Sequence, residues 1–478
     1  MNGLSRREFL ERSMLAAAAA SVPTLPAAAE RPRRTVGPND VLRVAVVGVK
    51  GRGLGHVSHF ANMKDVHVAA ICDIDENIIQ SAMKIAQDKS GKKPAYYKDI
   101  RKLLEDKSID AVSIATTNHW HTLAAFWAVQ AGKDAYVEKP TSHNLWEGRQ
   151  LIEAAKKYNR VVAAGTQRRS HASHLQAMEF MHSGKVGKLK SVRGICYKRR
   201  GTIGKRPDGP VPPGVDYDLW LGPAPLRPFN PNRFHYNWHW FWDYGNGDLG
   251  NTGVHDTDVI VWGVGKKELP RKAICLGGRF GYEDEGETPN TQIAALDYGD
   301  LQVVYEVRGL ETPAFHDFRY GVLFRCEEGY VVAALQTAGA FTPKGERIQS
   351  FTGRNDDDHF RNFVDAVKDR KPEAVRAGAL EGHLASGLCH LPNISYRLGE
   401  SRPFTTEAPF GDFEAADECY REAREHLKEN GVDPRKTMFR MGRALTFDPK
   451  SETFTGDAEA NALLRREYRK PFVVPETL

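Results

Sequence analysis

The chain has 478 residues, of which 41% are hydrophobic and 27% are charged, and its formal net charge is +6. This length exceeds what one hydrophobic core supports, so we expect a soluble protein of at least two domains. The net charge is small, and no basic cluster interleaved with aromatic residues is present, which argues against nucleic acid as a partner. No apolar run is long enough to predict insertion into a membrane.

Residues 1–29 carry the features of a twin-arginine export signal. Arg6 and Arg7 lie in the motif at 5–10, an alanine-rich segment follows, and small residues at 27–29 suit a cleavage site. The alternative is a disordered basic tail. We predict a signal peptide, the twin-arginine export machinery as a partner, and a periplasmic or otherwise exported location.

The six cysteines contain no C-x-x-C pair and show no metal-ligand spacing. An even count in an exported protein allows disulfides, but twin-arginine substrates fold before export in a reducing compartment. We therefore expect mostly buried free thiols, with Cys72 in an apolar strand as the clearest case.

A glycine-rich turn follows the first apolar strand of the mature chain, at 41–47. Gly48 and Gly53 fill the first and last places of a G-x-G-x-x-G pattern, whereas Lys50 stands at the middle place and Gly51 comes one residue late. Such a turn lets the backbone approach a phosphate at a helix N-terminus, and Arg52 could reach a pyrophosphate. The alternative is a strand, turn and helix whose glycines serve only the turn.

Asp73 strengthens the nucleotide interpretation. It ends a second apolar strand, at 66–72, and lies at the spacing where an acidic side chain accepts the ribose hydroxyls of a dinucleotide. The next residue is Ile74, not arginine, which favours NAD over NADP. We therefore predict NAD as the cofactor.

Apolar strands alternate with helical patterns from 41 to about 166, which predicts a Rossmann-type, doubly wound parallel sheet covered by helices on both faces. Ligands of such sheets bind beyond the carboxyl ends of the strands. Polar residues at these ends are therefore candidates for cofactor contacts. They are Thr116, Asn118, His119 and His121 after one strand, Glu138 and Lys139 after the next, and Gln167 and Arg168 after the last.

Lys139 precedes Pro140, which holds its backbone in an extended or turn conformation directly after a buried strand. Beside a cofactor, its amine could bind a substrate hydroxyl and stabilise a developing alkoxide. The alternative is a surface lysine in a loop, which the position at a strand end disfavours.

Beyond residue 168, apolar strands follow one another with few helices between them. This pattern predicts an α+β domain with a large, mainly antiparallel sheet. The segment 201–234 is rich in proline and glycine and predicts a long ordered loop. At 236–244, aromatic residues occupy every even position, so a strand would place five rings on one face. These rings suit sugar stacking, a core or a subunit interface equally well.

His255 is the candidate acid/base, because oxidation of a secondary alcohol needs a group that takes the hydroxyl proton near neutral pH. Asn251 lies four residues earlier, on the same face of a helical turn. A hydrogen-bonded structural histidine is the alternative. A metal site of His239, Asp243, Asp248 and His255 lacks tight ligand spacing, so we predict no metal. The candidate substrate-binding residues are Lys139, Arg168, Lys198, His239, Trp242, Asp248 and His255.

Gly48 to Gly53, Asp73, the Asn118–His121 rim and the motif Glu138-Lys139-Pro140 resemble the glucose–fructose oxidoreductase, inositol dehydrogenase and rhizopine-catabolism (Gfo/Idh/MocA) oxidoreductase family, in its twin-arginine-exported branch. The resemblance covers nearly the whole mature chain and implies a homo-oligomer. It also implies that Lys139 contacts substrate and nicotinamide and that Asn118, His119 and His121 contact the cofactor.

The family pairs its acid/base histidine with an aspartate four residues earlier, and Asn251 replaces that aspartate here. An amide can orient an imidazole but cannot stabilise its cation as a carboxylate does, which leaves Asp248 and Asp258 as the candidates for that role.

Three functions are consistent with these features. The leading hypothesis is an NAD(P)-dependent oxidoreductase acting on a CH–OH group of a sugar, glycoside or cyclitol, with a tightly held cofactor. The second is a redox-neutral enzyme that cleaves glycosides through a transient keto-sugar and elimination. The third is a non-enzymatic ligand-binding protein, which the presence of both Lys139 and His255 disfavours.

The predicted organisation has five parts. A linker at 30–40 follows the signal peptide, and the NAD(P)-binding domain covers 41–168. The substrate and oligomerisation domain covers 169–400, where Pro392 should break or kink a helix. A charged helix and a wrapping tail occupy 401–478.

Overall fold

The computed structural model describes residues 37, 39–404 and 409–476. The predicted signal peptide and most of the predicted linker lie outside these residues. All six cysteines lie within them, and none forms a disulfide; Cys326 is half-buried and the other five are buried. No helix of the described residues has the length and apolar character needed to cross a bilayer.

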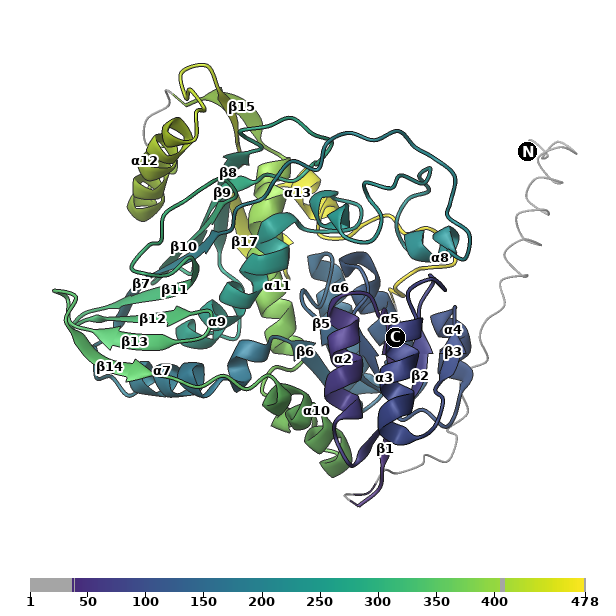
Figure 1. The fold of residues 1–478 in the computed structure, drawn as a ribbon. Coiled ribbons are helices and arrows are strands. Elements are labelled where there is room, and N and C mark those ends of the chain that lie inside the picture. The colour runs from purple at the N-terminus through teal and green to yellow at the C-terminus, as the bar shows by residue number, and fades with distance from the viewer. Residues whose placement is uncertain (1–36, 38, 405–408, 477–478) are drawn as a thin grey trace, which may run out of the picture. The chain divides into compact units, whose positions relative to one another are not determined.

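The first half of the described chain forms a parallel six-stranded sheet in the order β3-β2-β1-β4-β5-β6. Side chains alternate along β1, so Val44 and Val46 pack under α2, α3 and α10, while Ala45 and Val47 pack under α5 and α6 (Figure 1). This confirms the predicted doubly wound sheet. The strands are β1 (Leu42–Val47), β2 (Val66–Cys72), β3 (Ala95–Tyr97), β4 (Ala111–Ile114), β5 (Asp134–Glu138) and β6 (Val162–Gly165). The helices are α2 (Arg52–Ala61), α3 (Gln80–Ser90), α4 (Ile100–Glu105), α5 (Asn118–Gln130), α6 (Leu145–Lys157) and, from later in the chain, α10 (Asp357–Asp369).

The second half is organised on a 12-stranded sheet, in which only β7 and β10 pair in parallel, which confirms the predicted mainly antiparallel sheet. Along β9, Ala294 and Leu296 pack under α7, α9 and α11, whereas Ile293 and Ala295 pack against α12 on the other face. The strands are β7 (Leu189–Tyr197), β8 (Lys272–Gly278), β9 (Thr291–Asp297), β10 (Gln302–Arg308), β11 (Tyr320–Cys326), β12 (Tyr330–Ala334), β13 (Ala338–Phe341), β14 (Arg347–Phe351), β15 (Glu400–Pro403), β16 (Met438–Met441), β17 (Leu445–Asp448) and β18 (Thr453–Phe454). The helices are α7 (Ala172–His182), α9 (Val254–Val264), α11 (Ala379–Arg397) and α12 (Glu414–Glu429).

The aromatic segment at 236–244 is not a strand, contrary to prediction. It contains the 3-10 helix η2 (Asn237–Trp240) and then doubles back, with the Gly245 N–H donating to the Phe241 carbonyl at 2.9 Å. Only glycine fits at this return, because a Cβ on Gly245 would lie 2.7 Å from the backbone of His239. The rings therefore point in several directions, and Trp238, Trp240, Phe241 and Tyr244 are buried in one cluster with Trp220.

Helix α11 continues through Pro392, so a break at this proline, one of the two predicted outcomes, is wrong. Nearly all of its side chains are buried, because the helix passes between the two sheets (Figure 1). Packing on all sides therefore outweighs the roughly 3 kcal/mol that a proline costs inside a helix.

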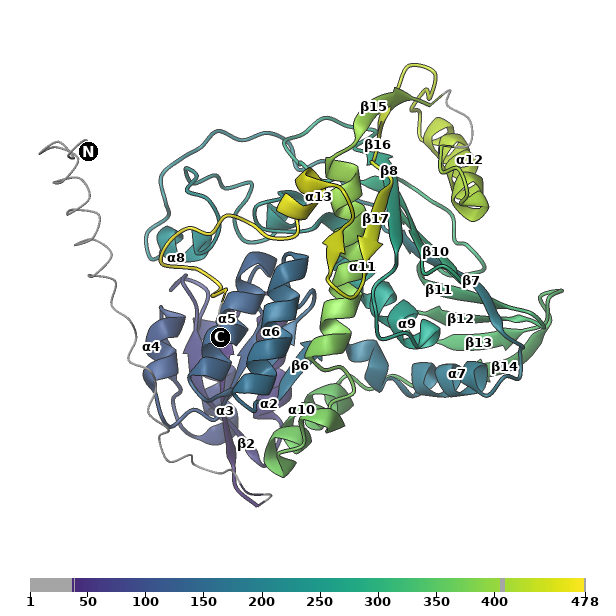
Figure 2. The ribbon, with the colours of Figure 1, turned by 180° about the vertical axis from the view of Figure 1, so that it is seen from behind.

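The C-terminal segment contributes to both halves. Strands β16 and β17 pair with β8, and after α13 (Ala458–Ala462) the chain returns to the first half, where Phe472 and Val474 are buried among residues of α5. Figure 2 shows this yellow segment passing from β17 and α13 toward α8 (Tyr217–Leu221).

Candidate active site

A cavity of about 820 Å³ lies at the carboxyl ends of β1, β2, β4, β5 and β6. From the second half of the chain, η3 (Leu249–Gly253), α9 and the adjacent ends of β7 and β11 also line it. Of the residues predicted from the sequence, the cavity lining includes Gly48, Lys50, Gly51, Arg52, Asp73, Thr116, Asn118, His121, Glu138, Lys139, Gln167, Arg168, Lys198, His239, Asn251 and His255.

The glycine-rich turn fits the phosphates of a dinucleotide. A Cβ on Gly48 would lie 2.8 Å from the Ala115 carbonyl, and one on Gly53 would lie 1.7 Å from the Gly48 carbonyl, so both positions require glycine. Gly53 supports the turn from beneath and does not line the cavity. Helix α2 begins at Arg52 with no side chain capping its first N–H groups, which leaves them available to an anion.

Arg52 lines the cavity and is tied to the end of β5. Its Nε donates to Glu138 Oε1 at 2.8 Å, and the same oxygen contacts His56 Nε2 and accepts from Gln167 Nε2, both at 3.1 Å. Although burial opposes it, the Arg52 charge and the His56 contact hold the pKa of Glu138 well below its usual range. Glu138 is therefore a buried anion that links the end of β5 to helix α2 and to Gln167, just after β6.

Asp73 presents a fixed carboxylate at the end of β2. Its Oδ2 accepts from the Val49 N–H at 2.8 Å and its Oδ1 from the Asp75 N–H at 3.0 Å. Burial raises the pKa of Asp73 to about 6. Two backbone donors use only part of the acceptor capacity of a carboxylate, so the group can still accept ribose hydroxyls. The hydrogen-bonding groups at this edge of the sheet therefore fit NAD. The residue beside Asp73 is Ile74, which is apolar and not cationic.

Two predicted cofactor contacts differ in their surroundings. His121 lines the cavity, and its ring nitrogens face the Pro140 carbonyl at 2.6 Å and the Thr116 carbonyl at 3.1 Å. His119 lies beneath the rim instead, where its Nε2 faces the Trp220 carbonyl at 3.0 Å, and burial lowers its pKa to about 3. His119 therefore holds the Trp220 backbone and has no place in the cavity wall.

Lys139, Asn251 and His255 meet at the inner end of the cavity. Lys139 is half-buried, and its Nζ donates to the main-chain oxygen of Asn251 at 2.9 Å and to Asn251 Oδ1 at 3.4 Å. His255 has no hydrogen-bond partner among the described residues. Burial, together with the nearby charges of Lys139 and Arg168, lowers the pKa of His255 well below its usual value. The imidazole is thus neutral and its nitrogens are free.

Two of the predicted substrate contacts lie outside the cavity lining. Asp248 is buried and accepts from Arg200 at 2.9 and 2.5 Å, and Trp242 packs against Tyr396 with Arg397 over its ring. Asp258, the other candidate partner for His255, accepts from Arg169, so neither carboxylate is free to replace the missing aspartate. Spacing in the sequence could not reveal these arginine partners.

The sequence also failed to identify the residues that a long connection brings to the cavity. This connection, residues 201–235, is called the strap below. It carries α8, which the teal loop of Figure 1 places near the carboxyl edge of the parallel sheet. Composition predicted an ordered loop but not its course. Cavity-lining residues from the strap and the aromatic segment after it are Leu219, Trp220, His235, Tyr236 and Trp238; others missed are Tyr320, Leu335, Arg354, Asp356 and His171.

The strap is attached to the nucleotide edge just after Asp73. Val215 forms a bridge with Asp75, the Asp216 N–H donates to the Ile74 carbonyl at 2.9 Å, and His235 Nε2 lies 2.8 Å from Asp75 Oδ2. These contacts hold the strap across the ribose end of the cavity.

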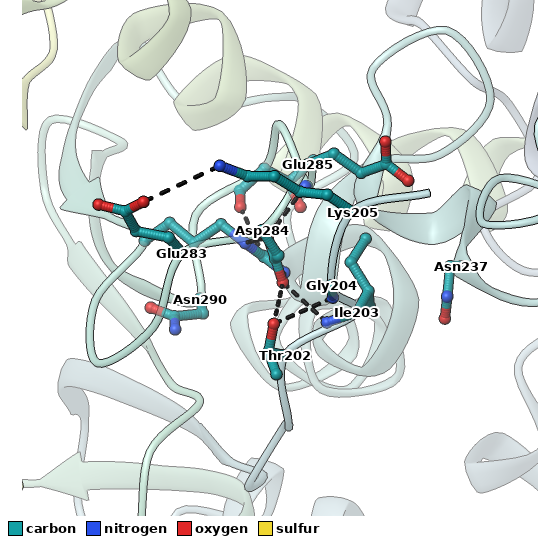
Figure 3. A network of polar contacts seen from close by, with 12 residues as sticks. Thr202, Ile203, Gly204, Lys205, Asn237, Glu283, Asp284, Glu285 and Asn290 are labelled. Carbon is teal, nitrogen blue, oxygen red and sulfur yellow. Dashed lines mark hydrogen bonds and ion pairs between the residues drawn. The ribbon is translucent and has the colours of Figure 1, made fainter. Parts of the chain in front are cut away.

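Asp284 fixes the beginning of the strap (Figure 3). It accepts from the Ile203 N–H at 2.9 Å and the Thr202 hydroxyl at 3.4 Å, and it forms an ion pair with Arg279. The carboxylate of Asp284 is therefore satisfied by partners within the protein. Within residues 37, 39–404 and 409–476, no group of three or more histidine, cysteine, aspartate or glutamate side chains could hold a metal ion.

Two family models match the chain. Residues 42–166 match an oxidoreductase family with an NAD-binding Rossmann fold, and residues 193–276 match the C-terminal alpha/beta domain of an oxidoreductase family, both under the name Gfo/Idh/MocA.

Curated relatives include a glycosyl hydrolase family 109 protein of a Shewanella species, 35% identical over 173 residues, and an alpha-N-acetylgalactosaminidase of Shewanella oneidensis, 30% identical over 174 residues. Each match covers 33% of this chain and 38% of the relative, so the chain spans well under two thirds of their length in these alignments.

Solved structures show the fold. The WlbA dehydrogenase from Bordetella pertussis, in complex with NADH and UDP-GlcNAcA, has a TM-score of 0.53 at 17% identity, covering 72% of this chain and 93% of that chain. The UDP-N-acetylglucosamine 3-dehydrogenase GnnA from Acidithiobacillus ferrooxidans has a TM-score of 0.50 at 17% identity, covering 73% and 95%.

Proposed function

The chain belongs to the Gfo/Idh/MocA oxidoreductase family, and on that premise we propose that it oxidises or reduces a secondary alcohol of a sugar, glycoside or cyclitol. NAD, which the family's Rossmann fold binds, supplies the hydride acceptor when bound. The observation that carries the proposal is the convergence of Lys139 and His255 on one cavity that also contains Gly48 and Asp73.

Lys139 and His255 have different roles in this proposal. Lys139, in its protonated form, donates a hydrogen bond to the reacting oxygen and stabilises negative charge that develops there. His255 takes the hydroxyl proton, because its imidazole lines the cavity and has no hydrogen-bond partner among the described residues. Asn251 positions the lysine through two oxygens and adds no charge.

We propose that the nucleotide is held tightly and is regenerated within the catalytic cycle. The support is the strap, whose polar contacts with Ile74 and Asp75 hold it over the ribose end of the cavity. Denaturing the purified protein and measuring the nucleotide released tests this. A stoichiometric release of NAD is expected, whereas an empty protein with only weak NAD affinity would contradict it.

A panel of glycosides and cyclitols, analysed by mass spectrometry for keto products, tests the activity. Lys139→Met and His255→Ala should each lower kcat/KM by roughly 10²- to 10⁴-fold. Lys190→Met is a matched control, because this exposed lysine of β7 pairs with Glu327 and lies outside the cavity lining. Unchanged turnover in both active-site variants would show that the assignment is wrong.

A redox-neutral glycosidase is the second candidate. The matched relatives named glycosyl hydrolase family 109 protein and alpha-N-acetylgalactosaminidase favour it, and so does the neutral Asn251 beside Lys139. Oxidation at one sugar carbon would acidify the neighbouring C–H, so the aglycone could be eliminated and water added. Return of the hydride from the reduced cofactor to the keto carbon would then restore the alcohol with no net redox change. The same panel distinguishes the two candidates, because the dehydrogenase yields a keto product and the glycosidase releases a free aglycone.

We further propose that the protein is exported through the twin-arginine pathway and associates with its own copies. The support for export is the motif that contains Arg6 and Arg7, and the support for association is family likeness. Changing both arginines to lysine in the full chain should keep the protein in the cytoplasm, as fractionation would show. Sedimentation of the mature protein gives its oligomeric state.

A further inference from the structure

The charges around the inner end of the cavity are not balanced. Two of the carboxylates that line the cavity already have cationic partners, since Glu138 pairs with Arg52 and Asp356 pairs with Arg354. By contrast, Lys139 donates only to uncharged oxygens of Asn251, and Lys198 has neither a hydrogen bond nor an ion pair among the described residues. Both lysines line the cavity and are half-buried.

Lys198 lies just beyond the end of β7, beside the reacting groups. Burial lowers the pKa of Lys139; the negative charge of Glu138 opposes that effect, while the positive charges of Arg52 and Lys198 add to it, so the two lysines are close enough to interact. Asp248, another carboxylate of this region, is buried and paired with Arg200. A positive charge in such a partly desolvated place is costly without a counter-charge.

Arg168 adds a second unsatisfied group. Its Nη1 is paired with the buried Asp256, which also accepts from the Tyr305 hydroxyl at 2.7 Å. Its Nη2 is buried and has no acceptor among the residues that the structure describes, although Arg168 lines the cavity. Buried guanidinium N–H groups normally have acceptors, so a ligand that supplies one is favoured here.

From this arrangement we infer that the substrate is an acidic sugar, whose negatively charged group is received by Lys198 and Arg168 while Lys139 binds the reacting hydroxyl. The simplest arrangement places the anion and that hydroxyl on the same sugar ring. A hexuronate or its glycoside is the simplest such molecule, and a sugar phosphate also presents a negatively charged group. This inference rests on the proposed function and specifies its substrate class.

Matched pairs of substrates test the inference with the NAD-loaded full chain. Methyl glucoside is compared with methyl glucuronide, the corresponding galactosides are compared in the same way, and glucose 6-phosphate distinguishes phosphate from carboxylate. Reduction of the bound nicotinamide in a single turnover is followed by absorbance. Because charged hydrogen bonds contribute more than neutral ones, kcat/KM should favour the acid over the neutral sugar by roughly 10- to 100-fold.

Variants of Lys198 show where the preference arises. Lys198→Met should bring the acid-to-neutral ratio close to one, and Lys198→Arg should restore most of it. Lys190→Met, which removes a charge from the same strand outside the cavity, should leave the ratio unchanged. Equal rates for acid and neutral sugars, or a ratio that persists in Lys198→Met, would overturn the inference while leaving the oxidoreductase proposal intact.

Calorimetry separates the two proposals if no sugar is turned over. In that case the proposed function fails, but binding of glucuronate and glucose to the NAD-loaded protein still tests the anion site. Tighter binding of the acid that is lost in Lys198→Met supports the site, and equal binding of both sugars excludes it.

Discussion

At the scale of single residues, the most informative position is Asn251, where a neutral amide contacts the amine of Lys139. Burial lowers the pKa of Lys139, and Asn251 offers only uncharged oxygens against that effect. Because the proposed role needs the protonated amine, activity is lost as pH rises through this pKa. The alkaline limb of the kcat/KM profile should therefore lie below the ordinary lysine value of about 10.5.

Asn251→Asp would place a carboxylate near Lys139 Nζ. An opposite charge at this distance favours the ammonium, so the pKa should rise and the alkaline limb should move up by about one unit or more. A pH profile of kcat/KM for the variant and the wild type measures the shift. Asn251→Ser serves as the uncharged comparison and should not move the limb upward. If the alkaline limb of the kcat/KM profile lies at the same pH in Asn251→Asp as in the wild type, Lys139 is not the group whose titration produces it.

Asp73 gives a second pH dependence at this scale. Burial raises its pKa to about 6 in the structure, so the carboxyl loses acceptor capacity as pH falls through that value. NAD affinity of nucleotide-free protein should therefore be constant above pH ~7 and weaken by up to tenfold per unit below ~6. Fluorescence titration with NAD from pH 5 to 8 measures this, and Asp73→Asn should bind more weakly with no such dependence.

The sequence predicted much of the site because its residues follow strand ends. Gly48, Asp73 and Lys139 all lie at the carboxyl edge of one parallel sheet, where chain order and strand length determine the place of a side chain. Trp242 and Asp248 were wrong as cavity residues, since their positions depend on Arg397 and Arg200 from distant elements. Long-range ion pairs of this kind leave no signal in local spacing.

At the scale of elements, the strap is the feature whose course the sequence did not reveal. Its contacts are polar and local to a few residues, so no hydrophobic periodicity marks the place where it meets the parallel sheet. The short strand β3 was missed for a related reason, because three residues carry too little pattern. The strands predicted at 41–47 and 66–72 match β1 and β2 closely, since each has buried side chains along its length.

Asn77 tests whether the strap retains the cofactor. Its Nδ2 donates to the Pro213 carbonyl at 2.9 Å and to Asp75 Oδ1 at 2.8 Å, yet it does not line the cavity. Asn77→Ala removes a contact of roughly 1 kcal/mol, so the dissociation rate of bound NAD should rise by about fivefold. The dissociation rate of bound NAD is measured by trapping the released nucleotide at successive times. Asp88→Ala, at an exposed position of the neighbouring α3, should release NAD at the wild-type rate.

At the scale of the whole molecule, the C-terminal segment joins the parallel sheet, the strap and the large sheet. Strands β16 and β17 extend the large sheet at β8, and Arg469 contacts both the Asp218 carboxylate and the Gly222 carbonyl in the strap region. A few residues later, Phe472 is buried on the helical face of the parallel sheet. The end of the chain therefore stabilises the arrangement that encloses the cavity.

Phe472 and Phe447 allow this role to be separated from simple core packing. Both are almost fully buried, but only Phe472 contacts Trp120, at 5.5 Å between ring centroids, and Trp120 lines the cavity. Each change to alanine should lower the free energy of unfolding by about 3 to 5 kcal/mol, as denaturant titration would measure. Phe472→Ala should also release bound NAD faster than the wild type, because Trp120 loses its support, whereas Phe447→Ala, in the large sheet, should retain the nucleotide. Equal release from both variants would mean that the tail acts only through overall stability.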